Sequence, residues 1–546
     1  MRGLRQIIAI NAGWRDVAWR RFVARWSLIA AIILGGTACL SLGWYFPDEY
    51  WQTIEFANCK LGGTPVEAMP WEFPAQMRPW LQPALYFAIA KTAGAVGFTD
   101  PFNLTLFFRL SSALCGWLAV TALMFGAYRL YPAVSPRKAA VYLLTLTAFL
   151  PYTLVRTSSE ATSSAFSMLG FALLILGDAK RGDSLEQSAG GGAFPGRLLF
   201  AVGLLWGAAF EFRYQAALFI AGFVFWLFFI RIKTARLPAV AALFGGIFTV
   251  VALGVLLDTW GYGAPVFAPW NYFTQNILHG KAAEFGVSPW YGYATLLLKP
   301  HLKYGVPLLL FLAIGAIIGS IRYPRQPLAW GLWLLVIAHS AVGHKELRFL
   351  TNALLPAILL TVYAFSPRHA DDKFWTKVWR WRGSIPLKIV YALNCLLLLH
   401  YPTALNNDEF PFIRWIYRNV ETPATLYSVG SSPYSFIGEP QRGLHYWFYL
   451  PPQTTVRHTA SLQEALTAAN GASAVWVMGR QMKKNLSAKP ASIHFIPPDK
   501  TAPPQIWTLN LVYFYEKQTL FSAVAEAVGG VANDRPAWVL YKLDRQ

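Results

Sequence analysis

Long apolar runs alternate with short polar segments along the first 403 residues of the chain. Several of these runs hold about 15–20 apolar residues, roughly the length that a helix needs to cross the hydrocarbon core of a bilayer. The alternation predicts a polytopic α-helical membrane protein with about eleven transmembrane helices. We place these helices at residues 27–44, 103–125, 139–155, 161–177, 198–212, 215–230, 237–257, 302–321, 327–342, 349–366 and 386–403.

The composition supports a membrane protein and argues against a soluble or nucleic-acid-binding one. Of the 546 residues, 55% are hydrophobic and 14% are charged, whereas an ordinary soluble protein has about 25% charged residues. The net charge of +20 is spread between the apolar runs, which is typical of charges that orient helices in a membrane, so no nucleic-acid partner is expected. Three of the four cysteines lie in apolar runs, so a disulfide framework is not expected either.

One apolar segment, residues 81–97, decides the side on which every later loop lies. The segment is barely long enough to cross, and Lys91 and two glycines interrupt it. If it does not cross, the loops on the N-terminal side hold 23 Lys and Arg residues, and those on the opposite side, without the C-terminal region, hold nine. Because positive residues favour the cytoplasmic side, we predict a cytoplasmic N-terminus and place 81–97 along the membrane interface, or dipping into it, as an amphipathic helix.

This topology divides the chain into three parts. Residues 1–26 form a basic cytoplasmic N-terminus, residues 27–403 form a transmembrane catalytic part with an outer loop at 45–102, and residues 404–546 form an extracytoplasmic domain. Strand-like and helix-like segments alternate after residue 403, which predicts a small α/β fold. The expected strands include "ATLYSVG", "ASAVWVMGR" and "AWVLYKLD", and the expected helices are "PFIRWIYRNV" and "SLQEALTAAN".

The polar and aromatic clusters at the membrane boundaries all fall on the outer side, which suggests one shared site. In "FPDEYWQTIEF", Asp48, Gln52 and Glu55 share one face at helical spacing, and Trp51 is placed to stack on a sugar. A carboxylate at the mouth of a helix bundle can act as a general base, which makes Asp48 and Glu49 candidate catalytic residues. The alternatives are that the two acids stabilise a helix start and that Trp51 is an interfacial anchor.

The segment "HKELRFL" puts four ionisable residues between two apolar runs, where isolated charges are costly. On a helix, His344 and Arg348 are four residues apart and share a face, with Lys345 beside them. Three donors clustered in this way suit a phosphate or pyrophosphate, and Glu346 either orders the cations or contacts a hydroxyl. The alternative is an interfacial cluster whose cations reach for lipid headgroups.

Further polar and aromatic residues end other spans on the same side. The arginines predict an electropositive outer cavity that favours an anionic substrate, in which Arg156 and Arg213 reach a phosphate. Taken singly, each arginine is more often an interfacial residue than a ligand. The segment "SPWYGY" belongs to an interfacial aromatic belt or lines a carbohydrate or isoprenoid groove. The candidate substrate-binding residues in these segments are Arg78, Glu160, Gln215, Trp290 and Tyr293.

Motifs for metals and nucleotides are missing from the predicted outer segments. The sequence has no DxD on that side, no zinc-type spacing of His and Cys, no Walker A loop and no glycine-rich dinucleotide fingerprint. A phosphate in this site is then neutralised by Arg, Lys and His side chains, so we expect no metal and no cofactor.

These segments resemble the family 22 glycosyltransferases, which are polytopic α-mannosyltransferases of the GT-C fold. "HKELRFL" resembles their HKE-x-RF signature, "FPDEYWQTIEFA" their first outer loop with its HPDE motif, and "LVRTSSEATSSA" their R-T-x-S-N segment. "WNYFTQNILHGKAAEFGVSPWYGY" resembles their N-F-x-x-F-N…YG-x-HPWHWY stretch. The order is kept from about residue 40 to 360, and the similarity extends to the subgroup that adds the third mannose to glycosylphosphatidylinositol (GPI) anchors.

The resemblance implies transfer of mannose, or a related hexose, from a β-linked polyprenyl or dolichyl phosphate to a glycan or glycolipid hydroxyl, with inversion to an α-linkage. In this comparison Asp48 and Glu49 match the acidic pair, and residues 344–349 match the signature. The departures lie at positions that we expect to face the acceptor, which fits a divergent or bacterial relative with a non-GPI acceptor. These departures are Phe46, Glu160, Ser288 and Gly292.

The resemblance also implies a location and leaves two other classes of protein to weigh. The site faces the periplasm of a bacterial inner membrane or the lumen of the endoplasmic reticulum, in contact with membrane lipids. An oligosaccharyl or phosphoethanolamine transferase is the enzymatic alternative, but we expect it to show an outer acidic metal cluster. A lipid-linked sugar flippase is the non-enzymatic alternative, and duplicated halves would support it. Neither feature is evident in the sequence.

Overall fold

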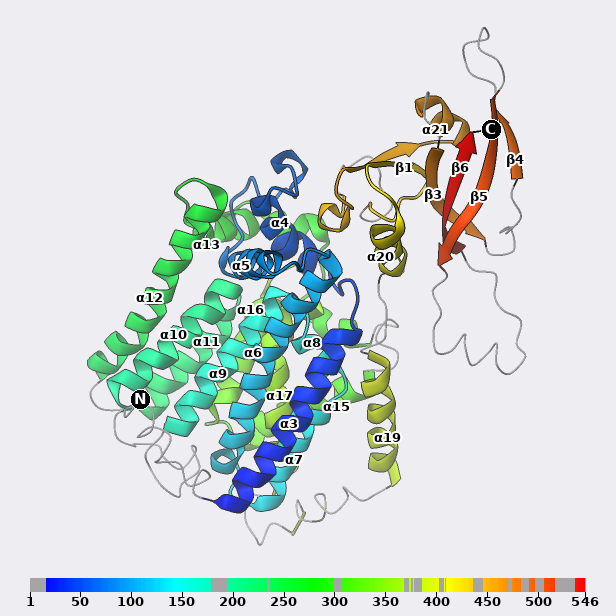
Figure 1. Ribbon diagram of the computed structural model, residues 1–546. Coiled ribbons are helices and arrows are strands. Elements are labelled where there is room, and N and C mark those ends of the chain that lie inside the picture. The colour runs from blue at the N-terminus through cyan, green and yellow to red at the C-terminus, as the bar shows by residue number, and fades with distance from the viewer. Residues whose placement is uncertain are drawn as a thin grey trace.

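A bundle of long helices makes up the larger part of the protein, and a β-sheet lies beyond one of its ends (Figure 1). The computed structural model describes residues 16–177, 194–232, 236–298, 306–367, 373–374, 377, 385–401, 407, 409–435, 445–469, 474–482, 491–495, 505–515 and 536–545. Residues 1–15, 178–193 and most of 367–388, which carry many of the predicted cytoplasmic charges, lie outside this range.

The bundle helices coincide with the apolar runs of the sequence, because a helix satisfies its backbone hydrogen bonds internally in an apolar environment. Within the described residues, five helical stretches are long and apolar enough to cross a membrane: α3 (Val17–Leu40), α6 (Pro101–Leu130), α9 (Ser159–Gly177), α12 (Arg236–Tyr262) and Leu347–Phe365, which contains α17 (Thr351–Phe365). A mainly helical fold with several apolar helices is confirmed, and the count of eleven spans stays a prediction. The shorter helices of the bundle are α7 (Val134–Leu146), α10 (Gly196–Phe212), α11 (Ala216–Phe225), α15 (Val306–Arg322), α16 (Pro327–Ala341) and α19 (Ile385–His400).

The first helix begins ten residues earlier than the apolar run predicts. The side chain of Asp16 accepts a hydrogen bond from the Trp19 N–H at 3.0 Å and caps the start of α3. Arg20 and Arg25 are exposed while Trp19 and Val23 are buried, so residues 17–26 form an amphipathic beginning of the same helix. The predicted boundary between the N-terminal segment and the transmembrane part, at residue 26, therefore lies inside helix α3.

The apolar run at 139–155 is broken rather than continuous. Helix α7 ends at Leu146, and a short helix, α8 (Phe149–Leu154), follows. Pro151 has no N–H to bond back to the preceding turn, which favours the break. The break leaves the Ala148 N–H without a helical partner, and the side-chain oxygen of Asn394 in α19 accepts a hydrogen bond from it at 3.0 Å.

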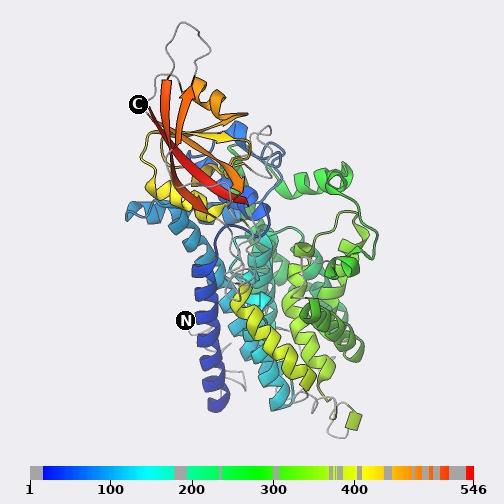
Figure 2. The same ribbon diagram turned by 90° about the vertical axis from the view of Figure 1, so that its right-hand side faces the viewer.

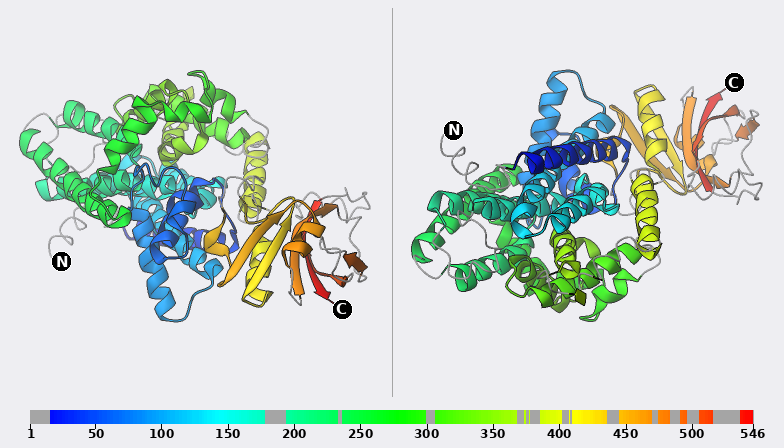
Figure 3. Two further views of the ribbon diagram at one scale, coloured as in Figure 1. Left: turned by 90° about the horizontal axis from the view of Figure 1, so that it is seen from above. Right: turned by 90° about the horizontal axis from the view of Figure 1, so that it is seen from below.

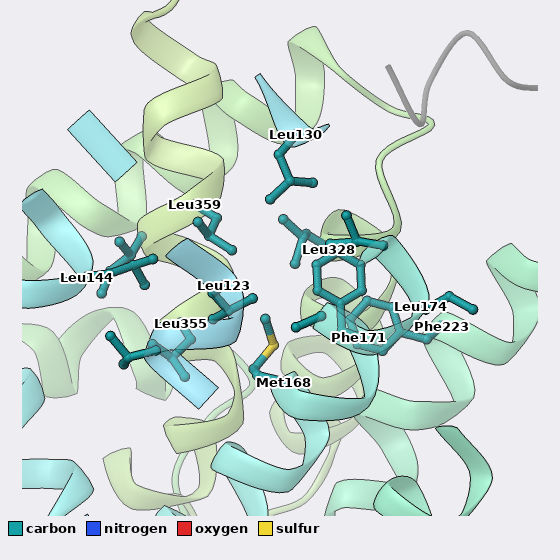
Figure 4. Packing of buried hydrophobic residues seen from close by; sticks show 14 of the residues in the cluster. Leu123, Leu130, Leu144, Met168, Phe171, Leu174, Phe223, Leu328, Leu355 and Leu359 are labelled. Carbon is teal, nitrogen blue, oxygen red and sulfur yellow. The ribbon is translucent and has the colours of Figure 1, made fainter. Parts of the chain in front are cut away.

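The centre of the bundle is filled by large apolar side chains from several helices. Leu123 of α6, Met168 of α9, and Leu355 and Leu359 of α17 point toward one another (Figure 4). Where two helices lie closest, glycine replaces a side chain. A Cβ built on Gly203 of α10 would lie 2.1 Å from the backbone oxygen of Leu243 in α12, so only glycine permits this approach.

A layer of short helices covers the end of the bundle nearest the sheet. It contains a π-helical turn (Tyr50–Ile54), α4 (Glu55–Leu61) and α5 (Leu81–Ala95). Helix α5 is formed within the segment that we placed at the membrane interface, residues 81–97, and it runs crosswise to α3 (Figure 2). It is not one of the candidate spans within the described residues.

The chain ends in a six-stranded mixed sheet, as the C-terminal sequence pattern predicts. Its strands are β1 (Ala424–Val429), β2 (Thr454–Thr459), β3 (Ala474–Met482), β4 (Ala491–Phe495), β5 (Gln505–Tyr515) and β6 (Pro536–Arg545), in the order β2-β1-β3-β6-β5-β4. Strands β2, β1 and β3 are parallel, and the remaining pairings are antiparallel. The expected helices are also present, as α20 (Phe410–Asn419) and α21 (Leu462–Ala468).

Helix α20 joins the sheet to the bundle. Its Trp415 ring stacks on Tyr513 of β5 at 4.5 Å between ring centroids, and Phe412 packs on Trp538 of β6. On the other side, Phe410 contacts the segment Trp447–Tyr449 that reaches the layer of short helices. Seen from above and below, the sheet lies to one side of the bundle axis, beyond α20 (Figure 3). The end of the bundle with the short helices is therefore only partly covered.

Candidate functional site

The predicted acidic pair lies in the tight turn that follows α3. Glu49 holds this turn, because one of its oxygens accepts hydrogen bonds from the N–H groups of Tyr45 and Phe46 at 3.1 and 3.2 Å. Asp48 is the first helical residue after Pro47, and its side chain is half-buried. The two neighbouring acids therefore differ: Glu49 is enclosed and structural, and Asp48 faces the cluster that follows α16.

Arg348 meets Asp48 across the mouth of the bundle. An Nη1 atom of Arg348 lies 2.5 Å from Oδ2 of Asp48, and its Nε atom lies 2.5 Å from Oε2 of Glu346. Burial tends to raise the pKa of Asp48, but the guanidinium groups of Arg348, Arg78 and Arg213 outweigh it and hold that pKa below its ordinary value. Asp48 is therefore ionised at neutral pH in this state.

Glu346 orders the signature segment. Its Oε1 atom pairs with Nε2 of His344 at 2.9 Å and accepts from Nη2 of Arg348 at 2.9 Å. The other ring nitrogen of His344 lies 3.2 Å from the Gly286 carbonyl oxygen. Of the two roles considered for Glu346, these contacts favour the positioning of His344 and Arg348.

The helical geometry expected for this segment is wrong. Helix α16 ends at Ala341, and only Leu347–Leu350 form a short 3₁₀ turn, so His344 and Arg348 do not share a helix face. Glu346 brings them together instead. Lys345 turns away, because its ammonium donates to the Ser288 and Val342 carbonyls at 3.0 and 2.5 Å.

Arg213 and Glu160 form a second buried pair beside the first. Their closest atoms are 3.1 Å apart, and each side chain is at most 5% exposed. Arg213 also donates to the side-chain oxygens of Gln52 and Gln215, both at 3.1 Å. Three predicted residues, Gln52, Glu160 and Gln215, thus meet around the guanidinium of Arg213.

Arg78 is held by an acid that the sequence analysis did not single out. Nη2 of Arg78 donates to Oε1 of Glu72 at 3.0 Å, and the same oxygen accepts from Nε2 of Gln52 at 3.1 Å. The signal for Glu72 in the sequence is an acid surrounded by apolar and aromatic residues, "MPWEFP", which must pair if it is buried.

Arg156 is enclosed at the back of the acidic turn. Its guanidinium donates to Glu49 at 3.0 Å, to the Gly43 carbonyl at 2.9 Å and to the Tyr152 hydroxyl at 3.1 Å. Burial raises the pKa of Glu49, and the positive charge of Arg156 opposes that rise. The side chain of Arg156 is thus occupied with the fold of the turn.

The site is a network of alternating charges and not the electropositive cavity that the arginines alone predict. Each arginine lies against an acid, because a charge removed from water is stable only when it is paired. A cavity of about 10 Å³, roughly room for one water molecule, lies between the pairs and is lined by Gln52, Arg78, Gln82 and Arg213 among others. The pairs are Arg78–Glu72, Arg156–Glu49, Arg213–Glu160 and Arg348–Asp48.

Two residues predicted to bind substrate point away from this network. Trp51 is buried and stacks on the Tyr446 ring at 5.9 Å between centroids, so it is neither a sugar platform nor a membrane anchor in this state. Glu55 is fully buried, and its Oε1 atom accepts from the Trp447 N–H at 3.0 Å and from the Tyr50 hydroxyl at 2.6 Å. The reason is the π-helical turn at Tyr50–Ile54, which has more residues per turn than an α-helix and so breaks the spacing that would align Glu55 with Asp48.

The aromatic segment lies beside the signature segment. The Ser288 N–H donates to the Gly343 carbonyl at 2.9 Å, and this hydrogen bond holds the aromatic segment next to the signature segment. Trp290 is 75% exposed, and Tyr293 is buried with a hydroxyl that has no hydrogen-bond partner among the described residues. The exposed ring of Trp290 is therefore open to a ligand, whereas the unpartnered hydroxyl of Tyr293 is enclosed in this state.

Among the described residues, no group of three or more His, Cys, Asp or Glu side chains is placed to hold a metal ion. The groups gathered at the site are guanidiniums, carboxylates and amides, which suit proton transfer and the binding of an anion. Metal independence itself stays a prediction.

Comparison with known proteins gives a consistent family. The sequence model of the Alg9-like mannosyltransferase family matches residues 26–424. GPI alpha-1,2-mannosyltransferase 3 of Xenopus laevis is 27% identical over 344 residues, which are 61% of this chain and 57% of the relative. Mannosyltransferase APTG1 of Arabidopsis thaliana is 26% identical over 341 residues, 60% of this chain and 56% of the relative. The match thus spans little more than half the length of these curated relatives.

Among solved structures, ArnT from Cupriavidus metallidurans, crystallised with undecaprenyl phosphate, superposes with a TM-score of 0.50 and 12% sequence identity. The superposition covers 96% of this chain and 98% of ArnT. At this identity the likeness shows a shared fold, including the combination of a helical bundle with a smaller C-terminal part.

Proposed function

The chain belongs to the Alg9-like mannosyltransferase family, and on that premise we propose that it is an inverting glycosyltransferase for a lipid-linked sugar. It moves mannose, or a related hexose, from a polyprenyl or dolichyl phosphate to a hydroxyl of a glycan or glycolipid. The transfer takes place on the extracytoplasmic or lumenal side, forms an α-linkage and needs no metal ion. The observation that supports the proposal is the contact between Arg348 and Asp48, because a carboxylate can accept the acceptor proton and a guanidinium can bind the donor phosphate.

In the reaction the acceptor oxygen forms a bond to the anomeric carbon as the bond from that carbon to the phosphate oxygen breaks. The acceptor proton passes to the Asp48 carboxylate, and the polyprenyl phosphate leaves with the bonding electron pair. Arg348 stabilises the charge that develops on this phosphate, so no general acid is required. His344 lies in the same network through Glu346 and is placed to contact the same phosphate.

Binding of the donor changes the partners of Arg348. The donor phosphate is an anion and competes with Asp48 and Glu346 for the same guanidinium. As Arg348 turns to the phosphate, Asp48 loses its nearest cation, and its pKa rises from the depressed value of the free state. The carboxylate thus becomes a better proton acceptor when the donor is in place.

The remaining predicted residues take supporting roles in this proposal. Arg213 and Glu160 set the wall beside Asp48, and Trp290 with Tyr293 offers an aromatic surface for the sugar or the lipid. Lys345 and Arg156 reach a phosphate only after leaving their present carbonyl and carboxylate partners. The guanidinium carbon of Arg348 lies 5.3 Å from the centroid of the Phe46 ring. This departure from the family pattern is therefore next to the arginine that we propose for the donor phosphate.

The test is Asp48→Asn in the purified full-length protein, assayed with a polyprenyl-phosphate mannose donor and a membrane glycolipid extract as acceptor. We expect turnover to fall by a factor of about 10²–10⁴, as for loss of a general base, with donor affinity largely kept. Glu67→Gln is the matched control, because Glu67 is an exposed carboxylate of the same outer loop. Wild-type turnover in Asp48→Asn would exclude Asp48 as the base, and loss of activity in EDTA would exclude the metal-free route.

A further inference from the structure

A second and larger cavity lies where the helix bundle meets the C-terminal part. Its volume is about 400 Å³, within the range typical of ligand sites, and it shares no lining residue with the small cavity of the candidate functional site. It lies between the end of α3, the start of α6 and the exposed side of α20. Nothing in the proposed sugar transfer uses this cavity.

Three arginines and no carboxylate line the cavity within the described residues: Arg109, Arg414 and Arg418. Arg418 pairs with Asp100 at 2.8 Å, and Asp100 is engaged as the cap of α6 through the Phe102 N–H. Arg414 is exposed on α20, one turn from Arg418. With a single acid beside three guanidiniums, the cavity keeps a positive charge that the alternating network of the candidate functional site does not have.

Arg109 makes the cavity a built site rather than a surface patch. Its residue surface is 4% exposed, and its Nε atom donates to the Ala38 carbonyl in the last turn of α3 at 3.0 Å. This is the one hydrogen bond that the described residues give to Arg109. Its Nη groups therefore remain for a ligand, and a buried guanidinium without a counterion gains strongly from an anion.

One wall of the cavity is apolar and comes from the ends of two candidate membrane-spanning helices, α3 and α6. Cys39 and Leu40 at the end of α3 are exposed, and Leu106 lies on α6. Both α3 and α6 are long and apolar enough to span a bilayer, so the cavity opens at the level where their apolar surfaces end. A ligand that fits has a negatively charged head beside the arginines and a hydrocarbon tail along the apolar surfaces of α3 and α6.

We propose that this cavity binds the phosphate headgroup of a membrane lipid that enters from the side. The phosphate lies between Arg109, Arg414 and Arg418, and the acyl or prenyl chain runs down past Leu40 and Leu106. Because Arg414 and Arg418 belong to α20, the lipid ties the C-terminal sheet to the membrane. The site holds whether or not the chain transfers a sugar, so it is tested by binding.

The experiment uses the full chain in phosphatidylcholine nanodiscs that contain a photoactivatable phosphatidic acid. Irradiation followed by peptide mapping is expected to place the crosslinks in residues 37–42, 102–110 and 411–418. Arg414→Gln is expected to lower the crosslinked fraction about tenfold, the usual effect of one charge-assisted hydrogen bond. Arg457→Gln is the matched control, because Arg457 is also an exposed arginine but lies on β2 and does not line the cavity; its crosslinked fraction should stay within twofold of wild type.

Three further results decide the proposal. Arg109→Gln should abolish the crosslinks, and size-exclusion chromatography shows whether this variant is folded. If it is not, the map on the wild-type protein stands by itself, and crosslinks spread evenly around the bundle overturn the site. Equal losses in Arg414→Gln and Arg457→Gln overturn it as well. Equal labelling by a photoactivatable diacylglycerol, which has no phosphate, rules out a lipid phosphate as the ligand.

Discussion

The Nη1 atom of Arg348 lies 2.5 Å from Oδ2 of Asp48, and this contact joins two distant segments at one end of the bundle. Asp48 comes from the turn after α3, and Arg348 from the segment between α16 and α17. The same guanidinium holds Glu346, which in turn holds His344. A single arginine thus connects the acid that we propose as the base to the residues that we propose for the donor phosphate.

Replacing Arg348 should weaken donor binding and turnover together. Arg348→Lys keeps the positive charge but cannot contact Asp48 and Glu346 from two sides, because an ammonium is a point charge without the planar fork. We expect kcat/KM for the lipid-phosphate donor to fall about tenfold in Arg348→Lys and by a further factor of ten or more in Arg348→Gln. Steady-state kinetics at several donor concentrations measure this, with Arg457→Lys as control. Unchanged donor KM in Arg348→Gln would remove Arg348 from the phosphate site.

The pH dependence of kcat/KM should report the depressed pKa of Asp48. A base must be ionised to act, so activity falls as the pH drops through its pKa in the free enzyme. Because nearby arginines outweigh burial and hold this pKa below 3.8, the wild type should show no loss from Asp48 between pH 5 and 7. Arg348→Gln removes the guanidinium that lowers this pKa most while burial remains, so the pKa rises and the acid limb should move to higher pH. Superimposable profiles for the two proteins contradict this assignment.

Arg156 should matter more for stability than for donor affinity. Both side chains of the Arg156–Glu49 pair are at most 5% exposed, so removing one partner strands a buried charge at a cost of about 3–5 kcal/mol. Arg156→Gln should therefore lower the melting temperature clearly, and the double variant with Glu49→Gln should recover part of the loss. Thermal unfolding in detergent measures this. A donor KM that rises as much in folded Arg156→Gln as in Arg348→Gln points instead to a direct phosphate contact.

Glu55 should make the stability of the protein depend on pH near neutrality. Burial raises its pKa to about 7, so the folded protein keeps a proton that the unfolded chain releases near 4.5. Stability is then full below about pH 4.5 and falls as the pH rises to 7, by at most about 3 kcal/mol.

A glutamine at this position removes the ionisation while keeping an acceptor for the Tyr50 hydroxyl and the Trp447 N–H. Glu55→Gln should flatten the difference in melting temperature between pH 5 and pH 8. Glu55→Ala should lower the melting temperature at both values, because both donors lose their acceptor. The same pH slope in Glu55→Gln and wild type assigns the dependence to other groups.

Two tryptophans near the site should respond differently to truncation. Trp51→Ala removes a buried ring that packs on Tyr446, so it should cost about 3–5 kcal/mol of stability. Trp290 is 75% exposed, so Trp290→Ala should leave the melting temperature within about 1 °C and raise the KM for donor or acceptor. Thermal unfolding and steady-state kinetics on both variants separate the two roles. An unchanged KM in Trp290→Ala leaves Trp290 as an interfacial residue.

Local sequence pattern was sufficient wherever one short segment carries the information. Apolar runs of helix length, the strands "ATLYSVG" and "AWVLYKLD", and the signature "HKELRFL" each predict their own structure or family. Helical spacing failed at two places. A π-helical turn separates Glu55 from Asp48, and the chain is not helical at His344, because backbone breaks near a site do not follow the regular period.

The amino-acid pattern was enough to predict a helical membrane protein of a mannosyltransferase family, with Asp48 and Arg348 among its candidate residues. Which charges meet could be seen only in the folded protein. It paired Arg78 with Glu72 and Arg156 with Glu49, turned Lys345 to backbone carbonyls, and buried Trp51 and Glu55 under the C-terminal part. The physical reason is that the sequence position of a charged or aromatic residue does not identify its partner. A buried group pairs with whichever group the packing of the helices brings close to it.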